Sequence, residues 1–141
     1  MSVRAAALAE ARRWIGTPYR HQASVCGAGA DCLGLVRGVW RALNGAEPEP
    51  PPPYPARWDA GGDDLLMQAA ERWLTPVAEA QPGDVILFRL KPGLSARHCG
   101  ILSSPDALIH AYWGRAVCET ALTQWWRRRI AGQFQFPSQV K

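Results

Sequence analysis

One cysteine of this 141-residue chain lies where a thiol could act as a nucleophile. In the stretch GADCLGLVRGVW (residues 29–40), Cys32 stands between Asp31 and apolar residues at helical spacing. Asp31 is predicted to cap the helix, and the free amide hydrogens of the first turn favour an anion there. Such a position lowers the pKa of a thiol and increases its thiolate fraction. The sequence therefore makes Cys32 the candidate nucleophile.

A thiol nucleophile needs a base, and the chain has three histidines, His21, His98 and His110. His98 begins one predicted strand, and His110 lies in the next strand. A two-residue loop at residues 105–106 would place His98 and His110 on opposite faces of the hairpin. A three- or five-residue loop centred on Ser104 would set them directly opposite each other on one face. In the second arrangement one imidazole could accept the thiol proton while the other orients it.

Each of these residues also has a purely structural interpretation. Cys32 falls on the apolar stripe of its helix, and free cysteines are among the most buried residues in proteins. His21 fits a structural role. A zinc site made of His21, Cys26, Cys32 and a later histidine lacks the closely spaced ligand pairs that such sites use. We therefore expect neither a metal nor another cofactor.

The other three cysteines, Cys26, Cys99 and Cys118, are predicted to be packing residues. Cys99 follows His98 in a predicted strand, so the two side chains should point to opposite faces. The sequence has no CxxC pair, and a protein made in the cytoplasm normally keeps its thiols reduced.

Hydrophobic periodicity predicts the elements that must position these residues. Helices are predicted at residues 2–15, 32–43 and 62–74, with a loop at 16–31. Strands are predicted at residues 85–90, 98–104, 107–113, 116–120 and 130–136. The inner face of the first helix should extend to Trp14 and Ile15. The Pro-rich stretch 47–55 predicts an extended crossover. Helices followed by a meandering antiparallel sheet indicate an α+β fold in a single domain, residues 1–141.

Composition limits the partners that the chain can bind. The net charge of +4 weakly favours an anionic partner, but there is no nucleic-acid motif, and Arg127–Arg129 is interpreted as a solvated helix end. No apolar run approaches the roughly 20 residues of a membrane span. Glu10, Arg12 and Arg13 interrupt the N-terminal apolar stretch. We therefore expect no nucleic-acid partner, no membrane span and no signal peptide, with synthesis in the bacterial cytoplasm.

Five segments resemble, in this order, the NlpC/P60 family of cysteine peptidases: WIGTPYRHQ (14–22), GADCLGLVRGVW (29–40), QPGDVILF (81–88), RHCGIL (97–102) and ALIHA (107–111). The resemblance covers most of the chain. It implies a papain-like α+β fold, with N-terminal helices packed on a central antiparallel sheet and the nucleophile at a helix N-terminus. It also implies that Cys32 is the nucleophile, His98 the base and His110 the orienting residue.

The same resemblance implies a substrate. Family members cut the stem peptides of bacterial peptidoglycan, typically between D-glutamate and a diamino acid. Tyr19 matches the family tyrosine beside the catalytic site, and Asp31 matches an acidic residue associated with gripping a free substrate amine. Leu33 departs from the family, since many members have a serine there that helps to hold the N-terminal end of the substrate. Leu33 stays a predicted substrate-binding position, but a preference for a free N-terminal L-alanine does not carry over.

The Cys-Leu-Gly motif and the run LVRGVWRALNG (35–45) look most like the phage-tail and gene-transfer-agent branch of the family. That resemblance implies an enzyme that is assembled with other tail or tail-tip proteins and acts in the periplasm and wall of a recipient cell. Two alternatives stay open. One is a tail-assembly or wall-binding component with a weak or vestigial site, and the other is an acyl transferase that uses the same thiol and histidines.

Overall fold

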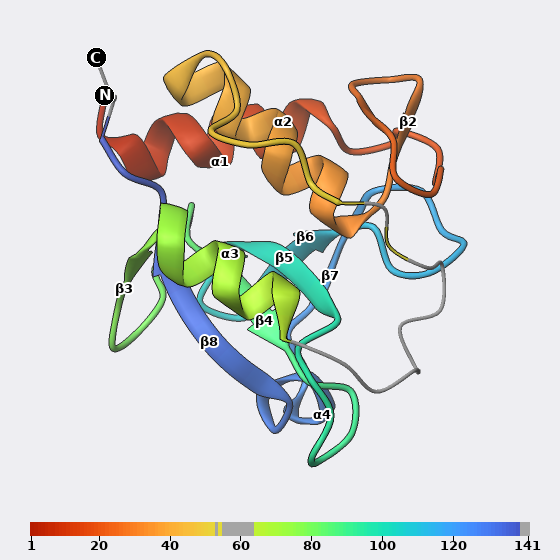
Figure 1. Ribbon diagram of the computed structural model, residues 1–141, viewed down its shortest axis with the longest axis vertical. Coiled ribbons are helices and arrows are strands. Elements are labelled where there is room, and N and C mark those ends of the chain that lie inside the picture. Colours follow the sequence, from red (N-terminus) through yellow and green to blue (C-terminus); the bar gives the residue numbers. More distant parts are fainter. Residues whose placement is uncertain (53, 55–63, 139–141) are drawn as a thin grey trace.

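A computed structural model describes residues 1–52, 54 and 64–138 (Figure 1). The helices are α1 (Val3–Arg13), α2 (Cys32–Asn44), α3 (Leu65–Trp73) and α4 (Gln124–Arg127). The strands are β1 (Ser24–Val25), β2 (Gly29–Ala30), β3 (Thr75–Pro76), β4 (Val85–Phe88), β5 (His98–Ser104), β6 (Ala107–His110), β7 (Cys118–Ala121) and β8 (Ile130–Gln135). Among the described residues, no helix has the length and apolar character needed to cross a membrane.

Six strands form one antiparallel sheet in the order β3-β8-β4-β5-β6-β7. Helices α1, α2 and α3 pack on one face of this sheet, where a large apolar cluster joins Leu35 of α2 to Val85 and Ile101 of the sheet. The short helix α4 (Figure 1) packs on the other face, where Trp126 and Phe88 belong to a second, smaller apolar cluster. This architecture confirms the predicted α+β fold.

The α1 helix packs on α2 through a glycine. Trp14, which follows α1, is 2% exposed, and a Cβ on Gly38 would lie 2.0 Å from its ring. Glycine at this position of α2 therefore lets the indole approach the helix backbone. The predicted extension of the inner face to Ile15 is wrong. The helix ends at Arg13, the chain turns at Gly16 (φ 94°), and Ile15 is 41% exposed.

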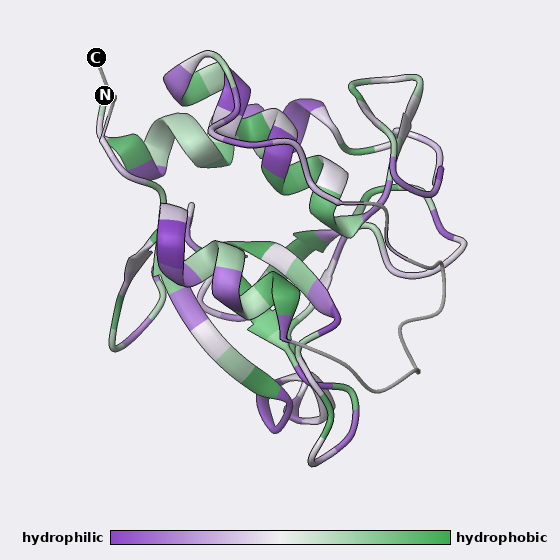
Figure 2. Ribbon diagram, viewed as in Figure 1, coloured by the Kyte–Doolittle hydropathy of each residue, from purple (hydrophilic) through white to green (hydrophobic). Residues whose placement is uncertain are grey.

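The α2 helix begins and ends close to its predicted boundaries. Asp31 caps it, because its Oδ1 accepts the backbone N–H of Gly34 at 2.7 Å, and Gly45 (φ 80°) ends it. Its buried side chains are Leu35, Val36, Val39 and Trp40. Figure 2 shows hydrophobic and hydrophilic residues alternating along this ribbon, as expected for a helix with one buried face. The apolar stripe anchors the helix, while Cys32 at its first position stays half-buried.

Several strands are shorter than predicted, because backbone pairing stops before the end of the apolar run. β4 ends at Phe88 rather than at residue 90, β6 ends at His110 rather than at residue 113, and β7 begins at Cys118. The sequence does not predict β1, β2 and β3, since two residues are too few to show a strand pattern. The predicted helix 62–74 is described from residue 64 onward. Residues 53 and 55 of the Pro-rich stretch also lie outside the described residues, and the rest of that stretch is neither helix nor strand.

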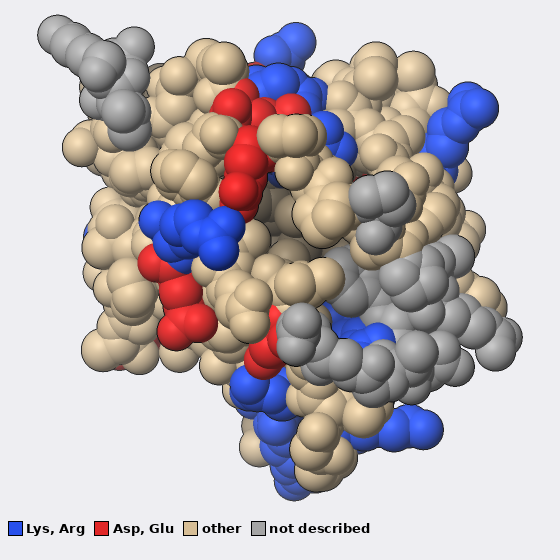
Figure 3. All heavy atoms as spheres, in the orientation of Figure 1, with Lys and Arg blue, Asp and Glu red and all other residues tan. Residues whose placement is uncertain are grey.

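Charged side chains on the face formed by α2, the Pro-rich stretch and α3 occur in pairs of opposite sign. Glu47 pairs with Arg37 and Arg41, and Glu49 pairs with Arg72. Figure 3 shows acidic groups next to basic ones across this face. The net charge of +4 is therefore not gathered into one basic patch on this side of the molecule.

Candidate active site

The β5–β6 hairpin brings His98 and His110 onto one face of the sheet by combining the shorter of the two predicted loops with a bulge that the sequence did not predict. The connection is a two-residue turn at residues 105–106. A β-bulge between Leu102 and Ser104 places one extra residue on β5 and shifts the register beyond it. His98 and His110 thereby become diagonal neighbours on one face rather than directly opposite residues. The two-residue loop and the pairing of Ser104 with Ala107 are thus confirmed for the first alternative, and the shared face for the second. The residue predicted to lie opposite His98 is wrong in both, because the sequence pattern did not reveal the bulge.

The two imidazoles form a buried hydrogen bond. His98 Nε2 lies 2.8 Å from His110 Nδ1, and His110 Nε2 lies 2.8 Å from Thr120 Oγ1 on β7. Burial, helped by the nearby charge of His98, lowers the pKa of His110 to about 3. His110 is therefore neutral at neutral pH. Its Nδ1 can accept the Nε2–H of His98 while its own Nε2–H donates to Thr120.

Two further residues shape the space around this pair. The ring centroid of Trp126 lies 5.2 Å from that of His98 and 5.3 Å from that of His110, and Trp126 is 9% exposed. Helix α4 thus shields the imidazole pair from water. On β5, a Cβ at Gly100 would lie 2.8 Å from Leu108 Cδ1 and 3.0 Å from His110 Cβ. Glycine at this position leaves room for the side chains of β6.

Cys32 lies on the side of His98 that faces away from His110, at the edge of a cleft. Its half-buried thiol lines the same cleft as His98 and packs against the apolar cluster that contains Cys99. The interaction with Cys99, followed by the interaction with His98 and its charge, lowers the pKa of Cys32 well below its ordinary value against the opposing effect of burial. Because Nε2 of His98 is directed at His110, Nδ1 is the nitrogen left to accept the thiol proton. The arrangement can hold a thiolate beside an imidazolium.

Asp31, the residue before Cys32, is buried and accepts three hydrogen bonds from within the protein. Its Oδ1 accepts the Gly34 N–H, and its Oδ2 accepts the Gln22 N–H at 2.7 Å and the hydroxyl of Tyr54. The carboxylate is 3% exposed. The side chains of His21 and Gln22 bond to the backbone carbonyl of Tyr54 at 2.7 and 2.8 Å. His21 therefore ties the Pro-rich stretch to the loop before the nucleophile.

A cleft of about 340 Å³ opens beside Cys32. Tyr19 and Asp31 line it together with Cys32 and His98, so four of the six predicted site residues meet there. His110 lies behind His98, which it touches. The cleft also presents aromatic rings and two basic side chains: Tyr54, Tyr112, Trp113, Lys91 and Arg97.

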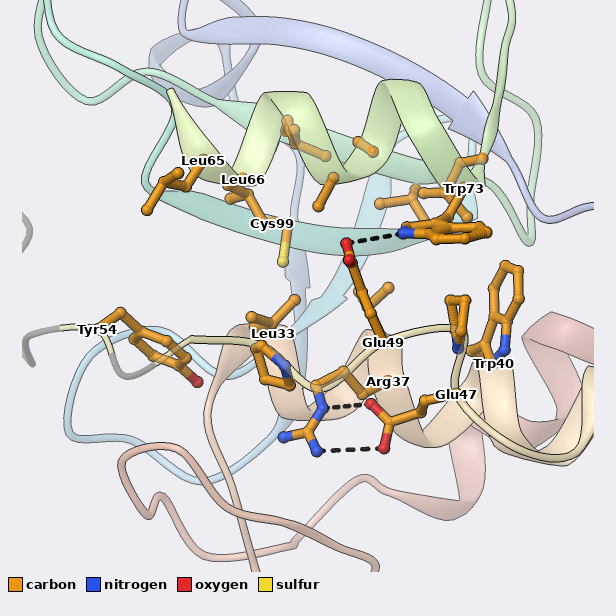
Figure 4. A pocket seen from close by; sticks show the side chains of 18 of the residues that line it. Leu33, Arg37, Trp40, Glu47, Glu49, Tyr54, Leu65, Leu66, Trp73 and Cys99 are labelled. Carbon is orange, nitrogen blue, oxygen red and sulfur yellow. Dashed lines mark hydrogen bonds and ion pairs between the residues drawn. The ribbon is translucent and has the colours of Figure 1, made fainter. Parts of the chain in front are cut away.

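Leu33 lines a different cavity, of about 150 Å³, between α2, the Pro-rich stretch and α3. Figure 4 shows Leu33 and Leu66 pointing into this space, with Cys99 above and the Arg37–Glu47 ion pair at its rim. The structure therefore places the predicted substrate-binding residue Leu33 behind the nucleophile rather than in the cleft with Tyr19.

The structure corrects one prediction about the remaining cysteines. Cys26 is exposed, with its Sγ 3.4 Å from the carbonyl oxygen of Arg13, so it is not a packing residue. Cys99 is buried and Cys118 is half-buried. Within the described residues, no group of three or more His, Cys, Asp or Glu side chains is placed to hold a metal ion.

Sequence reasoning missed three residues of the site. Thr120 meets His110 only because β7 pairs with β6, and neither the register nor the hydroxyl has a local sequence signal. Tyr54 reaches Asp31 across 23 positions of the chain, out of a stretch that predicts only an extended backbone. Trp126 had the clearest signal, since it belongs to a pair of tryptophans that follows the strand of His110, and a large aromatic residue there is a candidate to cover that strand.

Comparison with known proteins agrees with this geometry. A model of the NlpC/P60 family matches residues 16–134. No curated protein matches the chain. The structure of an NLP/P60-family protein similar to lipoprotein, from Staphylococcus aureus, is 20% identical with a TM-score of 0.65, and the alignment covers 95% of this chain and 41% of that one. The chain thus spans less than half the length of that protein.

Two further solved structures share the fold. The NlpC/p60 domain of the peptidoglycan hydrolase SagA is 24% identical with a TM-score of 0.63, over 94% of this chain and 98% of that one. NlpC1 from Trichomonas vaginalis is 19% identical with a TM-score of 0.63, over 92% of this chain and 42% of that one. At these identities the likeness concerns the fold, whereas the family model matches most of the sequence itself. The chain belongs to the NlpC/P60 family.

Proposed function

We propose that this protein is a peptidoglycan-cleaving cysteine endopeptidase that hydrolyses stem peptides, at the bond between D-glutamate and a diamino acid. The observation that carries the proposal is the chain of contacts from Cys32 through His98 to His110 at the edge of an open cleft. Membership of the NlpC/P60 family supports the substrate class, as does the similar fold of a domain of SagA, a peptidoglycan hydrolase.

In the proposed reaction, Nδ1 of His98 takes the Cys32 proton and the thiolate attacks the amide carbonyl. Backbone N–H groups at the start of α2, together with Tyr19 in the cleft, stabilise the oxyanion. Protonated His98 then gives its proton to the leaving amine, and water releases the acyl group from Cys32. Neutral His110 accepts the Nε2–H of His98 throughout and so keeps Nδ1 directed at the sulfur.

The proposal includes delivery by a phage tail or a gene transfer agent. Its support is the Cys-Leu-Gly motif with the run LVRGVWRALNG (35–45), which resembles that branch of the family. In this proposal the protein is made in a bacterial cytoplasm, joins tail or tail-tip proteins, and acts on the wall of the recipient cell.

The test is a digest of purified peptidoglycan, resolved by mass. Wild-type protein should release peptides with a new amino terminus on the diamino acid and one oxygen atom from water in the new carboxylate. Cys32→Ala should release none, whereas Cys26→Ser, which alters an exposed thiol, should match the wild type. Equal release by a folded Cys32→Ala protein would overturn the proposal.

The same digest separates the two alternatives. Acyl transfer would leave the new carboxyl joined to an amine instead of carrying oxygen from water. A wall-binding component would sediment with peptidoglycan and release nothing, and Trp113 in the cleft, 59% exposed, is the residue suited to such binding.

A further inference from the structure

A second thiol lies beside the nucleophile. Cys99 follows His98 on β5, is 1% exposed, and belongs to the apolar cluster against which Cys32 packs. Figure 4 shows its sulfur pointing away from the strand toward Leu33, the residue after Cys32. Helix α2, which begins at Cys32, packs on β5, and each of the two thiols shifts the pKa of the other. The two sulfurs therefore lie close together where α2 contacts β5.

The two thiols differ in access. Cys32 is half-buried and lines the cleft of about 340 Å³, so a small oxidant can reach it from solvent. Cys99 does not line that cleft and lies instead on the wall of the smaller cavity (Figure 4). An oxidant that enters the cleft therefore meets only one of the two sulfurs.

They also differ in ionisation. The interaction between them lowers the pKa of Cys32 and raises the pKa of Cys99, and burial raises the latter further. Cys32 is therefore the more readily ionised of the two thiols. A thiolate that is accessible, with a second thiol beside it, is the pattern of cysteines that are oxidised reversibly.

We propose that Cys32 and Cys99 form a reversible disulfide when a hydroperoxide oxidises the nucleophile. In the first step the Cys32 thiolate attacks the peroxide oxygen, which gives a sulfenic acid on Cys32 and, after protonation, an alcohol or water. In the second step the Cys99 sulfur attacks the Cys32 sulfur, an S–S bond forms, and water leaves with the Cys99 proton. The disulfide blocks the nucleophile and protects it from irreversible oxidation until a dithiol reduces it.

This inference goes beyond the proposed function, because it requires only the two thiols and not a wall substrate. The experiment treats the full chain with hydrogen peroxide, blocks free thiols, digests without reduction and identifies the linked peptides by mass. The wild type should yield a peptide pair joined through Cys32 and Cys99, and dithiothreitol should restore full alkylation of Cys32. Because the readout is thiol chemistry, a protein without wall-cleaving activity still tests the inference.

Matched variants complete the experiment. Cys26→Ser and Cys118→Ser should still form the linked pair. In Cys99→Ser and Cys99→Ala, peroxide should instead convert Cys32 to sulfinic acid, with loss of the alkylation that dithiothreitol recovers in the wild type. The inference fails if wild-type Cys32 is recovered as sulfinic acid or is joined to Cys26 or Cys118. That wild-type measurement decides the matter even where a Cys99 variant does not fold.

Discussion

At the scale of single residues, Cys32 differs from Cys26 in what surrounds the sulfur. Cys32 lies at the first position of α2, where Cys99 and His98 lower its pKa, whereas Cys26 is exposed in a loop with a backbone carbonyl as its neighbour. The lowered pKa of Cys32 means that its thiolate persists at a pH where an ordinary thiol is protonated.

This contrast predicts the rates of alkylation by iodoacetamide. At pH 6, Cys32 should react about tenfold faster than Cys26 in the same protein, since only the thiolate is nucleophilic. In His98→Ala the Cys32 rate should fall toward that of Cys26. Peptide mass spectrometry over time measures both rates in one sample. A Cys32 that reacts more slowly than Cys26 in wild type and variant alike would identify it as a structural thiol.

His110 couples the site to the stability of the fold. Its pKa of about 3 in the folded protein lies below the value of about 6.5 in an unfolded chain. Between these values the unfolded state binds a proton that the folded state does not, so the stability due to neutral His110 is complete above pH 6.5 and is lost as the pH falls toward 3. From pH 7 to pH 5 the loss amounts to about 2 kcal/mol.

Comparison with His110→Asn should isolate this effect. Asparagine is neutral at every pH, so the variant should lose about 2 kcal/mol less free energy of unfolding between pH 7 and pH 5 than the wild type does. Urea denaturation of both proteins at the two pH values gives the difference. Parallel losses would mean that His110 titrates normally and that its burial does not hold it neutral.

At the scale of elements, the four-residue helix α4 controls the environment of both histidines. Trp126 contacts His98, His110 and Phe88, and burial is the main cause of the low pKa of His110. Trp126→Leu should therefore admit water and raise the pKa of His110 from about 3, as seen in an imidazole NMR titration. Trp125→Leu, a change at the exposed neighbour, is the control. An unchanged His110 titration in Trp126→Leu would assign its burial to the sheet alone.

The elements also show which parts of the structure could be predicted from the sequence. Periodicity was sufficient for α2 and for its Asp31 cap, because the buried stripe, the cap and Gly45 all lie within one segment. Periodicity could not predict the bulge between Leu102 and Ser104, because a bulge leaves no sign in a pattern of alternating residues. The candidate pair of His98 and His110 was identifiable, but its diagonal geometry required the register.

At the scale of the whole molecule, the chain passes from the end of α2 through the Pro-rich stretch and returns to the beginning of that helix. Tyr54 ends the described part of this path, lines both cavities and donates its hydroxyl to Asp31. With Gly34 and Gln22 as the other donors, both oxygens of the carboxylate are occupied. Asp31 thus acts as a structural link between two segments, a role that the order of residues in the sequence does not reveal.

The burial of Asp31 and its three internal hydrogen bonds predict how the protein binds the amino terminus of a stem peptide. A hydrogen bond to a charged group contributes roughly 1.5–3 kcal/mol, so an enzyme that grips the substrate amine would prefer it by about tenfold or more. Because Asp31 is 3% exposed and already has three donors, we expect no such preference.

The matched substrates are L-Ala-γ-D-Glu-diamino acid and its analogue with a propionyl group in place of L-alanyl, which lacks only the amine. Their kcat/KM values should agree within about threefold. In Tyr54→Phe, which leaves one acceptor position of Asp31 vacant, the amine-bearing peptide should gain. A wild-type preference of tenfold for the amine would show that Asp31 exchanges one of its internal donors for the substrate.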